Sequence, residues 1–90
     1  MGDVYALIKV MPDEPNKGKE LEEKVLKTLG EIEGVKINKS EIEPVAFGIE
    51  AVKVSLILDG KKEGLIDEVE KKLNEIEIVS SVSVEELSLI

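Results

Sequence analysis

The sequence contains no cysteine, no histidine and no arginine, and each absence removes a class of chemistry. Without cysteine there is no disulfide, no thiolate nucleophile and no zinc ribbon. Without histidine the chain has neither the most common general base nor the most common metal ligand of proteins. Because all 12 basic residues are lysines, no guanidinium can bind a phosphate or a guanine through two parallel hydrogen bonds. We therefore expect neither an enzyme active site nor a bound metal or cofactor.

Aromatic residues are nearly as scarce, since Tyr5 and Phe47 are the only two. Two aromatic side chains are too few to form a platform on which nucleic-acid bases stack. The formal net charge of −8 also repels the phosphate backbone of DNA and RNA. We expect no direct binding of nucleic acid, which argues against an RNA-binding protein, and we expect a partner protein that presents a basic surface.

Long apolar runs are missing as well. No run approaches the roughly 20 residues that a helix needs to cross a bilayer, and the polar, acidic N-terminal segment does not have the form of a signal peptide. The 90 residues with 42% apolar content suffice for one hydrophobic core and not for a second. We expect residues 1–90 to form a single cytoplasmic domain that is monomeric when free and does not bind membranes.

The first half of the chain predicts a strand, a helix and a second strand. Side chains alternate over residues 3–11, and a segment with two prolines then ends this strand. Apolar residues next recur at helical spacing and are followed by two glycines that mark the helix end (Leu21, Val25, Leu29 and Ile32, then Gly30 and Gly34). Residues 35–42 alternate again, and their polar second half indicates an edge strand or a β-bulge.

The second half predicts two more strands around another helix. Residues 43–48 form a connection, and residues 49–58 are the clearest strand of the sequence, with one apolar face (Val52, Val54, Leu56 and Leu58). A turn at Asp59-Gly60 leads to a second helical repeat (Leu65, Ile66, Val69, Leu73 and Ile76). Residues 79–84 are expected to form the last strand and residues 85–90 a tail.

The order strand, helix, strand, strand, helix, strand predicts an α+β fold with the ferredoxin-like βαββαβ arrangement. In it a four-stranded antiparallel sheet carries both helices on one face. The other face is expected to be open to solvent, because only one side of the strands is consistently apolar. Lys9 and Lys53 should lie near each other on that open face, either as solvated charges or as a binding patch.

The connection before the third strand is the main candidate for function. It holds the only phenylalanine, Phe47, while Pro44 stiffens its entrance and Gly48 permits a backbone conformation that other residues avoid. A phenylalanine held in this way could serve as a compact anchor in a pocket of a partner protein. Alternatively, its side chain folds back and covers one end of the core. The residues alone leave both alternatives open.

A resemblance to a known family favours the anchor. The segment contains the run Pro44-Val45-Ala46-Phe47-Gly48-Ile49, followed by Ala51, Val52 and Lys53. Together with Lys9-Val10-Met11-Pro12 and Val79-Ser80-Ser81-Val82, it resembles the signature of the archaeal elongation factor one-beta family, and the likeness extends from about Val4 to Val84. The resemblance implies a guanine nucleotide exchange domain that binds the GTPase elongation factor one-alpha and speeds GDP release so that GTP can enter.

The same resemblance implies roles for particular residues. It makes Phe47 the aromatic that inserts into the GTPase near its nucleotide site, with Pro44, Val45, Ala46 and Gly48 around it. Family members usually carry a basic residue next to the C-terminus, whose charge disturbs the magnesium and phosphate site. An alignment without gaps places Leu89 there instead, so a direct part of this position in displacing magnesium is left open.

The alternative function, from another class, is a small-molecule-sensing regulatory domain of the same ferredoxin-like fold. Such domains bind an amino acid or a similar ligand across a dimer. The sequence offers no specific motif for this function.

Overall fold

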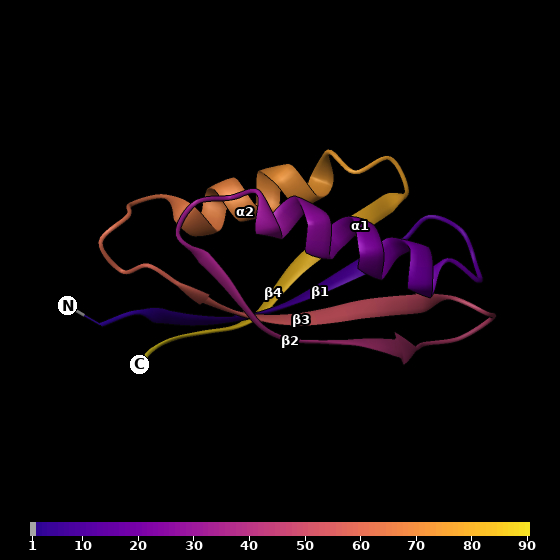
Figure 1. The fold of residues 1–90 in the computed structure, drawn as a ribbon. Helices are drawn as coiled ribbons and strands as arrows, with labels where there is room; N and C mark the ends of the chain where they lie inside the picture. The colour runs from indigo at the N-terminus through magenta and orange to yellow at the C-terminus, as the bar shows by residue number, and fades with distance from the viewer. Residues whose placement is uncertain (1) are drawn as a thin grey trace.

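The computed structural model describes residues 2–90 and shows six elements in the predicted order. They are β1 (Val4–Pro12), α1 (Gly18–Gly30), β2 (Val35–Pro44), β3 (Glu50–Leu58), α2 (Leu65–Asn74) and β4 (Val79–Leu89). The strands form one antiparallel sheet in the order β2-β3-β1-β4, and both helices cover the same face of it (Figure 1). The predicted ferredoxin-like α+β fold is therefore confirmed. No helix within residues 2–90 is long and apolar enough to cross a membrane.

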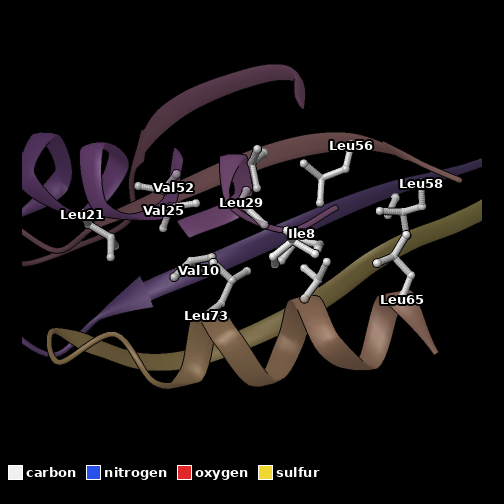
Figure 2. Packing of buried hydrophobic residues seen from close by; sticks show 14 residues of the cluster. Ile8, Val10, Leu21, Val25, Leu29, Val52, Leu56, Leu58, Leu65 and Leu73 are labelled. Carbon is white, nitrogen blue, oxygen red and sulfur yellow. The ribbon is translucent and has the colours of Figure 1, made fainter. Parts of the chain in front are cut away.

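The hydrophobic core lies between the two helices and the central strands. Most inward side chains of β1 and β3 are completely buried (Ala6, Ile8, Val10, Val52, Val54 and Leu56); Leu58 is 3% exposed, and Val4 at the start of β1 is partly buried. One row of each helix packs against them, at the spacing of three and four residues that the sequence shows (Leu21, Val25 and Leu29 of α1; Leu65, Val69 and Leu73 of α2) (Figure 2). Periodicity thus identified the core faces of both helices and of both central strands.

The last strand is longer than the sequence predicted. The expectation that residues 85–90 form a tail was wrong, because β4 continues to Leu89, and the N–H of Ile90 still donates to the carbonyl of Asp3 at 3.0 Å. The register between β1 and β4 shifts by one residue here, which leaves Glu85 without a partner in β1. Such a bulge absorbs one residue and lets pairing resume beyond it. The two glutamates that looked like the end of the strand therefore lie within it.

The strand β2 has both features that its polar second half indicated. It is an edge strand, and a register shift leaves Asn38 unpaired as a bulge. The side chain of Asn38 donates to Ser55 Oγ at 3.1 Å, and Ser55 Oγ donates to the carbonyl of Lys39 at 3.4 Å. The strand also reaches Pro44, so the following connection is shorter than expected.

The sheet face that carries no helix is less open than expected. Ala51 and Ser55 point to this face from β3, yet Ala51 is 0% and Ser55 5% exposed. Because β3 is a central strand, Ser55 is flanked on both sides, by Leu7 of β1 and by Lys39 of β2. The face carries no helix, as predicted, and Lys53 of β3 stays partly exposed on it, but the small residues of this strand are shielded by their neighbours.

Candidate functional site

Phe47 lies at the tip of the β2–β3 connection and points into solvent. Its side chain is 98% exposed, and Val45 in the same loop is 47% exposed. The alternative in which Phe47 covers one end of the core is therefore wrong. The ring of Phe47 therefore contributes nothing to packing within the chain and is accessible to a partner.

The backbone of this loop forms a tight turn from Ala46 to Ile49. The N–H of Ile49 donates to the carbonyl of Ala46 at 2.9 Å, and the N–H of Val45 donates to the carbonyl of Ile49 at 2.9 Å. The two central residues both have positive φ angles, 54° at Phe47 and 79° at Gly48. Two consecutive left-handed residues are characteristic of type I′ turns.

The left-handed conformation suits Gly48 but strains Phe47. Glycine has no Cβ and adopts positive φ freely, whereas a bulky residue there is an outlier. Strain of this kind costs on the order of 1–3 kcal/mol and persists where the surroundings impose it, which is most often at functional sites. Phe47 is thus unfavourable both in its exposure and in its backbone, and neither feature stabilises the fold.

The structure brings five of the six expected site residues together. Pro44 closes the β2–β3 ladder opposite Glu50, and the remaining four follow directly in the turn (Val45, Ala46, Phe47 and Gly48). Leu89 lies at the opposite end of the sheet, where it pairs with Val4. Since a strand rises about 3.3 Å per residue, the length of β3 alone separates the two ends by roughly 26 Å. Figure 1 shows the β2–β3 loop at one end of the molecule and both termini at the other.

The end that carries Leu89 is an apolar surface. Leu87, Leu89 and Ile90 are 52%, 82% and 68% exposed, although Leu87 and Leu89 lie opposite core-facing residues of β1. Next to them is a hollow of about 160 Å³ lined by residues that include Val4, Leu58 and Leu65. This volume is below the roughly 300–1,000 Å³ of pockets that hold a small-molecule ligand. The last six residues contain no cation, so Leu87, Leu89 and Ile90 offer apolar contact, while Asp59 and Lys62 also line the hollow.

Four charged residues, one from each strand, form a ladder across the sheet face that carries no helix. Glu43 of β2 lies 3.4 Å from the Nζ of Lys9 on β1 and 3.6 Å from the Nζ of Lys53 on β3. Lys53 also pairs with Glu85 of β4 at 3.5 Å. The carboxylate of Glu43 is the main cause that raises the pKa of Lys53; burial opposes it, and the carboxylate of Glu85 adds a further upward effect. The two lysines are neutralised by these partners and do not form a free anion-binding patch.

Sequence reasoning missed the partners of this ladder and a second feature beside the Phe47 turn. Glu85 was assigned to a tail, and only the bulge in β4 brings it into the ladder. Asn16, in the β1–α1 connection, shares a positive φ angle with Phe47. The signal available for Asn16 was its place between Pro15 and Gly18, since asparagine in such a segment tolerates the left-handed conformation.

Comparison with solved structures shows the fold. The ACT domain from the GTP pyrophosphokinase of Chlorobium tepidum superposes with a TM-score of 0.67 at 15% sequence identity, over 91% of this chain and 97% of that chain. At this identity the likeness concerns architecture and carries no functional information. The residues of the Phe47 turn must therefore be compared at the level of sequence.

Comparison of sequences identifies the family. The model of the EF-1 guanine nucleotide exchange domain matches residues 5–90. The chain is 40% identical over 90 residues to elongation factor 1-beta of Methanococcus maripaludis, with 100% of both chains covered. It is 38% identical over 89 residues to elongation factor 1-beta of Methanothermobacter thermautotrophicus, covering 93% of this chain and 92% of the relative. This chain therefore belongs to the elongation factor 1-beta family and carries its guanine nucleotide exchange domain.

Proposed function

We propose that this protein binds the translation GTPase elongation factor 1-alpha and accelerates the release of its GDP, so that GTP can enter. The observation that carries the proposal is the Phe47 turn, in which an exposed aromatic is held in a strained backbone conformation. The turn lies within the matched exchange domain. Its exposed neighbours Val45 and Ala46 are small enough to let the aromatic ring enter a pocket of the partner.

Exchange of this kind follows from differential binding. If the factor binds the nucleotide-free GTPase more tightly than the GDP-bound form, the affinity of the GTPase for GDP falls by the same ratio. A preference of about 1.4 kcal/mol weakens GDP binding tenfold. No proton transfer is required from the factor, which is compatible with a sequence that has neither histidine nor cysteine.

The positions of the two candidate contact residues support a proposal of two separate contact areas on the GTPase. Phe47 and Leu89 lie at opposite ends of the sheet, roughly 26 Å apart. At this separation we expect the two side chains to contact different parts of the GTPase surface. The end with Leu89 contributes apolar contact through Leu87, Leu89 and Ile90, where other family members are expected to place a cation.

The alternative of a small-molecule-sensing domain has less support. The likeness to the ACT domain is one of fold, and the sequence offers no specific motif for a small-molecule ligand. A sensing domain would also leave the strained conformation of Phe47 without a role. We therefore retain the exchange function as the proposal.

The direct test follows GDP release. Elongation factor 1-alpha from the same source is loaded with fluorescent GDP, and a tenfold or larger acceleration of release is expected from catalytic amounts of this protein at physiological salt and magnesium. The fluorescence decay after addition of excess unlabelled GTP reports the rate. Release at the intrinsic rate, even with the protein in excess, would show that the proposal is wrong.

A further inference from the structure

The Phe47 turn does not stand alone, because the β1–α1 connection (residues 13–17) lies against it. The backbone N–H of Asn16 donates to the carbonyl of Gly48 at 2.9 Å. A Cβ placed on Gly48 would lie 3.2 Å from the Cβ of Pro15, which shows how closely the two segments approach. Residues that are 32 positions apart in sequence, Asn16 and Gly48, thus form one joined tip at this end of the molecule.

Both segments of this tip contain a strained residue. Asn16 has a φ angle of 60° and Phe47 one of 54°, and within residues 2–90 they are the only non-glycine residues with positive φ. Asparagine tolerates the left-handed conformation because its short side chain can bond locally, whereas phenylalanine does not. The hydrogen bond from Asn16 to Gly48 therefore joins the two segments that hold the left-handed non-glycine residues among residues 2–90.

A second contact ties the same two segments together. Glu50, which follows the turn, accepts a hydrogen bond from the N–H of Gly18 at 3.2 Å. Gly18 is buried, and a Cβ there would lie 2.8 Å from both the Cβ of Glu50 and the Cγ2 of Ile42. Because Lys17 provides no side-chain cap for α1, Glu50 supplies an acceptor at the start of this helix from another element. The turn is thus fastened to the β1–α1 connection and to α1.

We propose that Asn16 is a positioning residue for partner binding. Its N–H, presented from the left-handed conformation, holds the carbonyl of Gly48 and thereby keeps Phe47 in its strained turn before the partner arrives. This inference rests on the proposed function. It adds the β1–α1 connection to the segments that hold Phe47 in place for the partner. We call the hydrogen bond from Asn16 to Gly48 the clamp. A loop ordered in advance loses less conformational entropy on binding, so the clamp increases affinity without contacting the partner.

The test uses two substitutions with opposite backbone preferences at a positive φ angle. Asn16→Gly adopts positive φ freely, whereas Asn16→Val disfavours it, and both retain the N–H that donates to Gly48. The Asn16 side chain is exposed and both variants remove it, so Asn16→Gly is the matched control. If Asn16→Val does not fold, Asn16→Ala replaces it in the comparison with Asn16→Gly, because alanine is less strained than valine at positive φ.

Proteolysis reports the clamp without any GTPase. Phe47 is the only phenylalanine, and the other aromatic, Tyr5, lies within β1, so cleavage by chymotrypsin after Phe47, identified by mass, measures opening of the turn. We expect cleavage to be about three- to tenfold faster in Asn16→Val than in the parent. Asn16→Gly should remain within about twofold of the parent. Equal rates in all three proteins would overturn the clamp.

Exchange kinetics then connect the clamp to function. Asn16→Val should raise the KM for the GTPase about three- to tenfold with little change in kcat, because the binding-competent turn is less populated. Asn16→Gly should keep the parent KM. An unchanged KM in Asn16→Val, despite faster cleavage, would show that the clamp does not serve binding. Failure of the parent protein itself to promote exchange would count against the proposed function, while the cleavage result would still decide the clamp.

Discussion

At the scale of single residues, Phe47 lowers the stability of the free protein rather than raising it. Its ring buries nothing in the free protein and its backbone lies in a region that phenylalanine avoids. Asparagine is the residue that the first central position of a type I′ turn prefers. Replacing Phe47 by asparagine therefore separates the effect of this residue on fold stability from its effect on partner binding.

The prediction for this residue concerns Phe47→Ala and Phe47→Asn. Both should lower kcat/KM for exchange tenfold or more, because loss of an aromatic anchor costs about 2 kcal/mol or more of binding energy. Phe47→Asn should also raise the melting temperature, because relief of about 1 kcal/mol of strain shifts Tm by roughly 4–8 °C in a domain of this size. Thermal melting and GDP release measured on the same samples check both statements.

The contradicting outcome for Phe47 is equally specific. A fall in melting temperature in Phe47→Asn, with exchange per folded molecule unchanged, would mean that the ring stabilises the fold rather than the complex. Val45→Ala is the matched control, since Val45 is a half-exposed apolar residue of the same loop. Its exchange rate should change less than that of Phe47→Ala.

At the scale of elements, periodicity predicted which helix residues pack in the core. It failed where the end of a strand depends only on pairing with its neighbour. The rows Leu21–Leu29 and Leu65–Leu73 face the core as predicted, because burial selects apolar residues at the helical repeat. The end of β4 was missed, since its two glutamates interrupt the alternation and only the partner strand β1 provides the pairing that continues it. Bulges move the register by one residue, and a local pattern cannot show this.

The candidate site was predictable only in part, for the same reason. The run around Phe47 was identified from its residue types and its family resemblance, since a loop has no periodic signal. Whether the ring pointed inward or outward depended on backbone angles that the sequence left open. The contact between Asn16 and Gly48 joins segments that are distant in sequence, so no local pattern indicated it.

The charged ladder gives the prediction at the scale of elements. Its carboxylates, that of Glu43 foremost, raise the pKa of Lys53, so Lys53 binds its proton more tightly in the folded protein than in the unfolded chain. The stabilisation is complete below the ordinary lysine pKa of about 10.4 and is lost as the pH rises through the higher folded value. We expect the difference in melting temperature between the parent and Lys53→Met to be constant near pH 8 and to decrease above about pH 10.5.

The control for this ladder is Lys19→Met. Lys19 is exposed on α1, and none of the ion pairs found among residues 2–90 includes it. The difference between the parent and Lys19→Met should therefore change little over the same alkaline range. If Lys53→Met and Lys19→Met show the same pH dependence, the ladder does not contribute to stability.

At the scale of the whole molecule, the proposed function makes the sheet a rigid spacer between two expected contact areas. The molecule measures 43 Å along its longest axis and 20 and 16 Å along the others. Phe47 lies at one end and the apolar group Leu87, Leu89 and Ile90 at the other. A single continuous core joins the two ends, so the spacing between them is fixed by packed strands rather than by a flexible linker.

The last prediction tests whether the two ends act independently. Leu89→Ala should reduce exchange less than Phe47→Ala does, because Leu89 offers only a peripheral apolar contact. Leu89→Lys should preserve or raise the rate by placing a cation at this end.

Sites more than about 10 Å apart with no shared partners usually have additive effects within about 0.5 kcal/mol. Phe47→Ala should therefore lower kcat/KM by the same ratio, within about twofold, in the parent and in Leu89→Ala. Exchange rates of the two single variants and the double variant, measured at several magnesium concentrations, decide the point. A Phe47→Ala effect that disappears in the Leu89→Ala background would show that both ends serve one cooperative contact and that the sheet is not a spacer between two.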